Sequence, residues 1–128
     1  MEIMVERRLS HRTEEALLGA ILLDNQYLLA AMNEGIKSKH FQLAHTRRIF
    51  TCMAKLRLRR QPIDIVTLTT ALHGSDELAP GVESDLNMVG GLAYLASLTR
   101  GISLRPSIES YARILHEDYW ARSRKPLA

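Results

Sequence analysis

The sequence is poor in cysteine and in aromatic residues. Its one cysteine, Cys52, excludes an internal disulfide and a cysteine-rich zinc site. Aromatic residues make up 5% of the chain, so the core has to be built from aliphatic side chains and methionine. No apolar run reaches the roughly 18 residues of a membrane-spanning helix, and the mixed charges of residues 1–10 do not suit a secretory signal. We therefore expect a cytoplasmic protein without membrane contact.

No motif for catalysis or nucleotide binding is present. A phosphate-binding loop of the form GxxxxGK[ST] ends in Gly-Lys-Ser or Gly-Lys-Thr, and none of the seven glycines is followed in this way. The five histidines contain no i, i+4 pair, the spacing that places two imidazoles on one helix face. No serine lies in a motif that would place it beside a base. The sequence predicts a protein that is not an enzyme, with no catalytic residue, cofactor or metal.

Positive charge is weak overall but strongly segregated along the chain. The formal net charge is +3 and the pI is near 9.3, values that alone say little about nucleic acid. Residues 37–60 hold eight Lys or Arg and no acid, whereas residues 61–99 hold five acids and no Lys or Arg. Such an asymmetry can orient a charged partner, although two solvated faces without a partner would give the same pattern.

Hydrophobic periodicity predicts an all-α domain, a compact bundle of about six helices without paired strands. The first helix is expected to start at Thr13, with Ser10 as a competing cap, because the acids that follow suit a helix N-terminus. Asp64 is expected to cap the fourth helix, although its β-branched residues would also suit a strand. The remaining expected elements are helices over residues 26–35 (ending at Gly35), 44–59, 90–98 and 108–122, and a polar loop over 73–88. One globular domain over residues 1–122 and a frayed tail over 123–128 complete the prediction.

Helical spacing also predicts which side chains share a face. An apolar stripe on residues 44–59 comprises Ile49, Met53, Leu56 and Arg60. A basic stripe about a quarter turn away is a candidate contact for phosphates or for an acidic partner, and it comprises Arg48, Lys55 and Arg59. The apolar face of the helix over residues 90–98 comprises Leu92, Leu95 and Leu98. Few aromatic residues accompany the basic stripe, which argues against a stacking platform for single strands.

Four sequence blocks occur in a specific order. They are EEALLGAILLD at residues 14–24, HF with HTRRIF at 40–50, PIDIVTL at 62–68, and VGGLAYL with Leu98 at 89–98. A weaker block, YARIL with Arg122, follows at 111–122. In this order and spacing they resemble the N-terminal domain of DnaB-type replicative DNA helicases. The sequence departs from that pattern at His40, where the family has an acid, and at Gln42, where it has an aromatic residue.

The resemblance implies an interaction domain that works in DNA replication. In that family the N-terminal domains form a collar on a hexameric ring, largely through a long helical hairpin that is not expected here. The domain would contact primase and neighbouring helicase subunits, with weak self-association, and DNA contact is not expected of it alone. ATP-driven unwinding belongs to a motor domain that these 128 residues do not contain.

Asp64 and Tyr94 match recurring family positions and are candidate residues of a partner interface. A helix cap at Asp64 and a core position for Tyr94 are the competing interpretations. Two other functions also stay open. The first is a small DNA-binding protein that uses residues 37–60, which the salt dependence of oligonucleotide binding would test. The second is a stand-alone regulator of a helicase.

Overall fold

Seven α-helices and one 3-10 turn make up the regular structure of the computed structural model, which describes residues 2–73, 85–100, 102 and 105–124. The helices are α1 (Glu2–Leu23), α2 (Gln26–Asn33), η1 (Ser38–His40), α3 (Ala44–Leu58), α4 (Ile65–His73), α5 (Asp85–Met88), α6 (Gly91–Ser97) and α7 (Ile108–Ser123). The described residues contain no strand, which confirms the all-α prediction and excludes the strand alternative for residues 65–72. None of the described helices is long and apolar enough to span a membrane.

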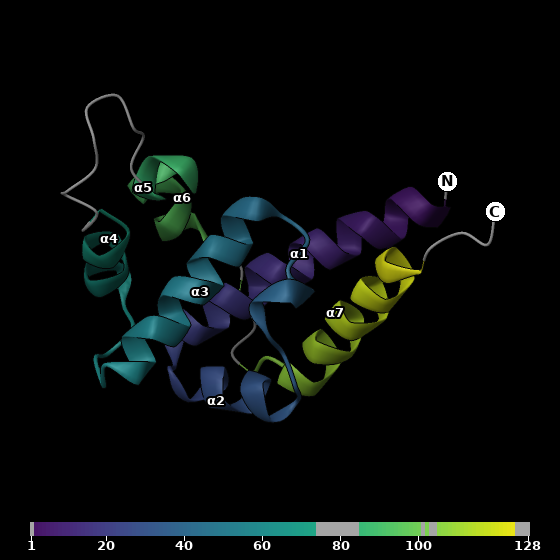
Figure 1. The fold of residues 1–128 in the computed structure, drawn as a ribbon, viewed down its shortest axis with the longest axis horizontal. Helices are drawn as coiled ribbons and strands as arrows, with labels where there is room; N and C mark the ends of the chain where they lie inside the picture. Colours follow the sequence, from purple (N-terminus) through teal and green to yellow (C-terminus); the bar gives the residue numbers. More distant parts are fainter. Residues whose placement is uncertain (1, 74–84, 101, 103–104, 125–128) are drawn as a thin grey trace.

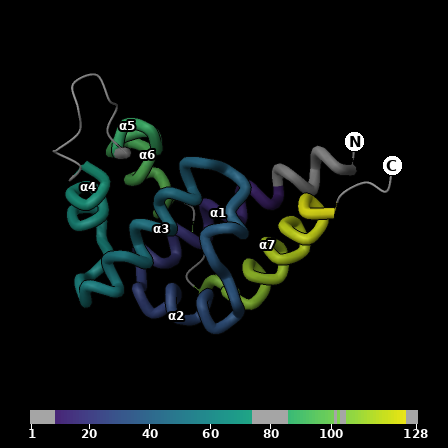
Figure 2. The backbone as a smooth tube through the Cα atoms, in the orientation of Figure 1, coloured from purple at the N-terminus to yellow at the C-terminus, as the bar shows by residue number. Residues whose placement is uncertain are grey.

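Helix α3 lies between two groups of helices (Figure 1). On one side α1 and α7 pack side by side in antiparallel directions, and α2 packs against both of them. On the other side α4 packs against α3, and α5 and α6 pack against α4. The backbone trace shows α7 running beside the described part of α1, across the molecule from α4, α5 and α6 (Figure 2).

The core is aliphatic, as the composition requires. Its largest fully buried side chains come from several of the helices and include Leu17 and Ile21 of α1, Leu28 of α2, Met53 of α3, Leu68 of α4, Leu95 of α6 and Leu115 of α7, together with residues of the connecting segments. The only two phenylalanines, Phe41 and Phe50, are both buried in this core and stack on each other with ring centroids 4.7 Å apart. A fully buried leucine contributes about 1.5–3 kcal/mol relative to an exposed one, so burial of these side chains from several helices stabilises the domain as a whole.

A glycine allows α1 to approach the end of α6 closely. A Cβ atom on Gly19 would lie 2.0 Å from the backbone oxygen of Leu98 and from the side chain of Ile102. The backbone oxygen cannot move aside cheaply, so this crossing requires a residue without a side chain. Gly19 therefore determines how closely α6 approaches the helix that carries the core.

The predicted start of the first helix is wrong. Helix α1 begins at Glu2, and both Ser10 and Thr13 lie inside it. The Thr13 hydroxyl donates to the Leu9 carbonyl oxygen at 2.6 Å, one turn back along the same helix. Glu14 and Glu15 resemble an acidic first turn in the sequence, but in the structure they reach sideways to other helices.

Other helix ends follow local signals. Gly35 ends α2 with a φ of +79°, and the N–H of Ile36 bonds back to Ala31, as predicted for a glycine after a helix. Helix α3 ends at Leu58, and Arg60 takes a φ of +56° in the same kind of closing turn. Arg60 is therefore exposed and does not continue the predicted apolar stripe, because the helix ends before reaching it.

The second half of the chain contains two more corrections. The predicted polar loop over 73–88 includes the short helix α5, and its residues 74–84 lie outside the described residues, as do residues 125–128 of the predicted tail. On α6 the side chains of Leu95 and Leu98 are buried as predicted, but Leu92 is 53% exposed. In so short a helix the buried face is set by the contacts of its second turn rather than by apolar spacing.

Candidate functional site

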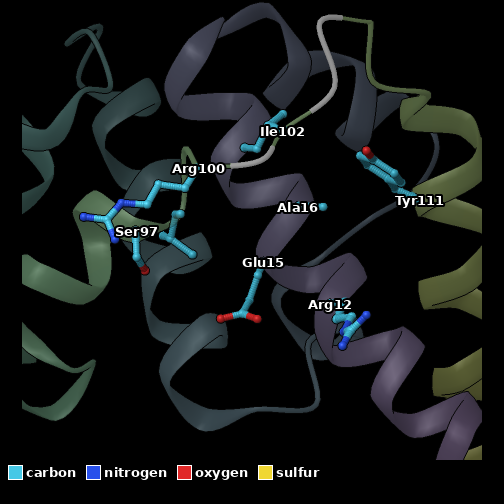
Figure 3. A pocket seen from close by; sticks show the side chains of 8 residues that line it. Arg12, Glu15, Ala16, Ser97, Arg100, Ile102 and Tyr111 are labelled. Atoms are coloured by element: carbon cyan, nitrogen blue, oxygen red, sulfur yellow. The ribbon is translucent and has the colours of Figure 1, made fainter.

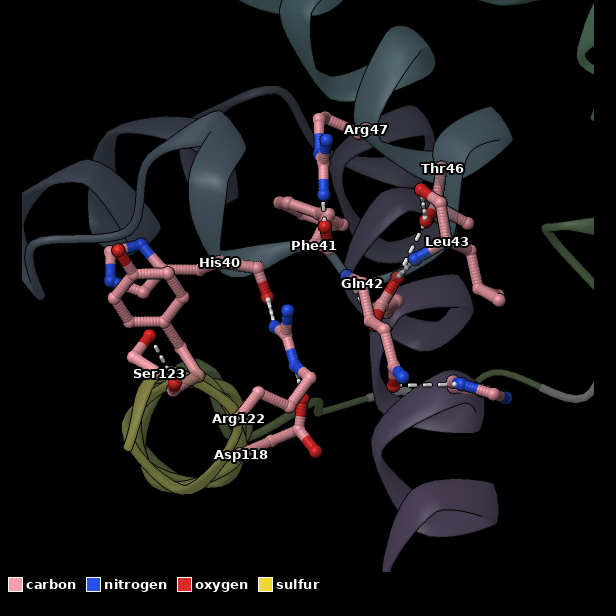
Figure 4. A network of polar contacts seen from close by, with 12 residues as sticks. His40, Phe41, Gln42, Leu43, Thr46, Arg47, Asp118, Arg122 and Ser123 are labelled. Carbon is pink, nitrogen blue, oxygen red and sulfur yellow. Dashed lines mark hydrogen bonds and ion pairs between the residues drawn. The ribbon is translucent and has the colours of Figure 1, made fainter. Parts of the chain in front are cut away.

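The N-terminal end of α3 is fixed by a buried carboxylate from α1. Glu14 is fully buried, and its oxygens accept hydrogen bonds from the backbone N–H groups of Gln42 and Leu43 at 3.0 and 3.2 Å. The hydroxyl of Thr46, also fully buried, donates a third at 2.5 Å (Figure 4). Leu43, the N-cap residue of α3, makes no side-chain cap hydrogen bond; Glu14 instead fixes the backbone at the entry to α3, where it accepts the N–H groups of Leu43 and of the residue before it.

The next residue of α1 connects to α6. The Tyr94 hydroxyl donates to Glu15 Oε2 at 2.7 Å, and His45 Nε2 lies 3.1 Å from the same hydroxyl oxygen. Because that hydroxyl has one proton and gives it to Glu15, His45 Nε2 has to carry a proton and act as the donor. Burial, and then the hydrogen bond and charge of Glu15, raise the pKa of Tyr94 well above its usual value, so the hydroxyl stays protonated.

A pocket of about 440 Å³ opens beside this network (Figure 3). Glu15 points into it from α1, and its other walls carry Arg12, Arg100 and Tyr111. Charges of both signs line it, together with the side chains of Ala16 and Leu98. Within the described residues no three His, Cys, Asp or Glu side chains come together as metal ligands would. The pocket therefore offers charge and hydrogen bonds for binding rather than a metal centre.

The C-terminal end of α3 is open. Between the last turn of α3 and the outer face of α4 lies a cleft of about 580 Å³. Val66, on the wall formed by α4, is 72% exposed, and Leu58 nearby in the chain is 84% exposed. The cleft is lined by Leu56, Arg59, Gln61, Pro62, Val66, Thr67, Thr70 and Ala71. The exposed apolar side chains and the exposed cations around this cleft make it a candidate surface for a partner.

The three members of the predicted basic stripe have different surroundings. Arg59 is exposed and lines the cleft, and Lys55 is exposed one turn before it on α3. Arg48 is half-buried, and its guanidinium lies 2.7 Å from the Met88 sulfur on α5. Arg48 therefore joins α3 to α5, and Arg59 is the member of the stripe that borders an open surface.

The two candidate interface residues also have structural tasks. Asp64 is exposed and caps α4, where Oδ1 accepts the Thr67 N–H at 2.8 Å and the Asp64 N–H donates to the Thr67 hydroxyl at 2.9 Å. Tyr94 directs its hydroxyl inward, to Glu15 and His45. No contact described in the structure joins Asp64 to Tyr94. Asp64 lies at the surface and follows the cleft residue Pro62 by two positions, whereas Tyr94 lies at the junction of α1, α3 and α6.

Sequence reasoning missed the residues that connect distant parts of the chain. Glu14, Glu15 and His45 are examples, and Asn25 is another. The Asn25 side chain accepts the Ile63 N–H at 2.8 Å and donates to the carbonyl oxygens of Ile63 and Ile21 at 2.7 and 2.8 Å. The available signal is that Glu14, Glu15 and Asn25 flank a strongly apolar segment. The sequence interpretation already explains these polar residues as the start and the end of a helix.

Comparison with known proteins identifies the family. A family model described as the DnaB-like helicase N terminal domain matches residues 7–117. The chain belongs to this family. It is 33% identical over 108 residues to replicative DNA helicase DnaB of Geobacillus stearothermophilus, covering 84% of this chain and 22% of that protein. It is 36% identical over 108 residues to replicative DNA helicase DnaB of Haemophilus influenzae, covering 84% of this chain and 21% of that protein.

The DnaB-like assignment agrees with the fold. The crystal structure of the N-terminal domain of DnaB helicase from Mycobacterium tuberculosis matches with a TM-score of 0.75 and 22% identity, over 87% of this chain and 73% of that chain. At this identity the match shows the shared fold. The DnaB-like chain spans about a fifth of the length of its curated relatives, so only their N-terminal domain is represented.

Proposed function

We propose that this DnaB-like domain is a non-catalytic interaction module of a replicative DNA helicase, which contacts primase and neighbouring helicase subunits in the cytoplasm. ATP-driven unwinding would belong to the part of the relatives that the chain does not match. The observation that carries the proposal is the open cleft at the C-terminal end of α3, in a domain of this family.

The chemistry of the cleft specifies the kind of segment that it would bind. Val66 and Pro62 offer apolar contact, and Arg59 lines the cleft beside them. Two more exposed arginines, Arg57 and Arg60, lie within two positions of Arg59 in the sequence. A helix of primase with one apolar stripe and acidic flanks would complement this surface. Such a segment would bury Val66 and pair with Arg59, while Asp64 on the same edge would disfavour partners that carry negative charge at that point.

Tyr94 would act on this interface indirectly. It joins α6 to α1 and α3, and α6 packs against α4, the helix that forms one wall of the cleft. Loss of the hydroxyl would loosen the support of α4 rather than remove a contact with the partner. Asp64 and Tyr94 are therefore proposed as a surface residue and a supporting residue of the same interface.

Binding to primase from the same organism tests the proposal, with titration calorimetry as the measurement. Val66→Asp places an unpaired charge in the cleft and should weaken binding at least tenfold, whereas Leu92→Asp, a matched change at an exposed leucine of α6, should have little effect. Arg59→Glu should weaken binding, and Arg113→Glu on α7 should not. Equal losses in the test and control variants would contradict the cleft as the site, and no binding by the unmodified chain would contradict primase as its partner.

Contact with other subunits is tested separately. The proposal expects weak self-association of this chain, because one small domain offers limited apolar surface for a stable assembly. Sedimentation velocity over a range of concentrations measures it. A stable hexamer at micromolar concentration would contradict weak self-association.

A further inference from the structure

Two aromatic side chains are followed by two arginines at the C-terminal end of α7, far along the chain from the basic stripe of α3. Tyr119 and Trp120 are consecutive there, and Arg122 and Arg124 follow them. Lys39, from η1, completes the group, which we call the α7 aromatic cluster. Trp120 is 60% exposed, the largest exposed aromatic side chain among the described residues.

At least one cationic side chain lies over each aromatic ring of the cluster. The Arg124 guanidinium carbon lies 3.8 Å from the centre of the Trp120 ring. Lys39 Nζ and the Arg122 guanidinium carbon lie 5.1 and 5.6 Å from the centre of the Tyr119 ring. Cation–π contacts at exposed sites are weak, about 0.5–1 kcal/mol each, so these cations can move to an anionic ligand at small cost.

We propose that the α7 aromatic cluster binds single-stranded nucleic acid, with a base stacked on Trp120 and phosphates bound by Arg124 and Lys39. An exposed indole bordered by cations meets both needs of such a ligand, because every base has a flat face and every linkage has a negative charge. The contacts are independent of base sequence, so the surface would follow a passing strand. A duplex keeps its bases stacked inside and cannot use Trp120 in this way.

The proposal is independent of the primase proposal in its residues and in its location. The cleft lies between α3 and α4, whereas the α7 aromatic cluster lies where α7 passes η1. Two carboxylates border the cluster. Asp118 is paired with Arg122 at 2.6 Å, and Glu117 is exposed. The negative charge of Glu117 should weaken the binding of a polyanion. Its removal in Glu117→Gln should therefore strengthen binding, the opposite of the effect expected when a cation is removed.

Trp120 is the only tryptophan, so its fluorescence reports on this site directly. Oligothymidylate and oligouridylate are titrated into the unmodified chain at low and at higher salt. We expect saturable quenching with a dissociation constant of about 10–100 µM at low salt, weakening as salt rises. Similar affinity for the two oligonucleotides would mean that the site does not distinguish deoxyribose from ribose. Tighter binding of oligothymidylate or of oligouridylate would identify DNA or RNA, respectively, as the preferred ligand. Absence of saturable quenching at low salt would overturn the proposal.

Variants separate stacking from simple charge, with affinity measured by the anisotropy of a labelled oligonucleotide. Trp120→Ala should weaken binding about fivefold or more and Trp120→Phe less, since one base loses its stacking partner. Arg124→Gln should lower the affinity and reduce the salt slope by about 0.7, the share of one phosphate on a single strand. Glu117→Gln should tighten binding. Thermal melts confirm that these exposed positions leave the fold intact.

Arg57→Gln is the matched control, because Arg57 is an exposed arginine on the last turn of α3. It should change affinity little. A loss as large as that of Arg124→Gln would place the contact on the last turn of α3 and overturn the proposal. Equally tight binding of polyphosphate or polyglutamate, which have no bases, would overturn it as well, because charge alone would then explain the affinity.

Discussion

Helix α3 begins against a buried carboxylate and ends among exposed cations beside an open cleft. At its first turn, Glu14 satisfies two backbone donors and a hydroxyl away from water, and His45 joins Tyr94 to Glu15. At its last turn the arginines are exposed, and Leu58 and Val66 face water. One helix thus has one end that holds the fold together and one end that is available to a partner.

The difference shows how adjacent residues of the same type come to have unequal roles. Glu14 and Glu15 follow one another on α1, so they point in different directions. Glu14 meets the start of α3 and is fully buried, while Glu15 meets Tyr94 and borders a pocket. Substitutions at the two ends of α3 should therefore separate folding from binding.

Removal of the Glu14 carboxylate should have the largest effect. Glu14→Ala would leave the N–H groups of Gln42 and Leu43 and the Thr46 hydroxyl without their acceptor, at a cost of about 3–5 kcal/mol in the free energy of unfolding. Urea denaturation followed by circular dichroism measures it. Glu15→Ala, the matched change next to it, should cost less. A loss below about 1 kcal/mol for Glu14→Ala would contradict the view of this end as the anchor.

Tyr94→Phe should have an intermediate effect. It removes one hydroxyl and leaves Glu15 and the His45 N–H partly buried without that partner, which should cost about 1–2 kcal/mol. The same denaturation experiment measures it. If Tyr94 supports α4 through α6, the variant should also bind primase more weakly. Full stability together with weaker binding would instead make Tyr94 a direct contact.

The pH dependence of stability should show a smaller contribution from His40, just before α3. His40 Nδ1 accepts the Lys37 N–H at 2.9 Å, and burial, with the charges of His116, Lys39 and Arg122, lowers the pKa of His40 below 6.5. The unfolded chain therefore binds this proton more readily than the folded chain. The contribution is complete above pH 6.5 and is lost as pH falls below it through the folded-state pKa.

Melting temperatures between pH 8 and pH 5 measure this contribution, and His40→Asn is the control, because its side-chain oxygen can accept the same N–H without titrating. The variant should lose part of the decline at low pH. An unchanged pH profile would show that His40 does not cause the decline.

The open end of α3 should tolerate substitution best. Val66→Ala and Arg59→Gln should change the free energy of unfolding by less than about 0.5 kcal/mol, because neither side chain is buried. Thermal melts of both variants check this. A large destabilisation would mean that this end also holds the fold, and the contrast between the two ends of α3 would fail.

Sequence reasoning succeeded where the signal is local. The Asp64 cap and the Gly35 end of α2 were predicted because each depends on residues within a few positions. The partners of Glu14 lie 28 to 32 residues away, so no local pattern could show that an acid beside an apolar run is buried. The burial predicted for Leu92 was wrong for a related reason, because apolar spacing along the chain does not decide which face of so short a helix is buried.

The Asn25 side chain links two distant parts of the chain without a covalent bond. Its amide accepts the Ile63 N–H and donates to the Ile63 carbonyl oxygen, 38 residues away. These two hydrogen bonds hold together the two ends of the segment that contains α2, η1 and α3. Secreted domains often join the two ends of such a segment with a disulfide, a solution that needs two cysteines. Here a single planar side chain determines where the chain returns after α3, and thereby where α4 and one wall of the cleft begin.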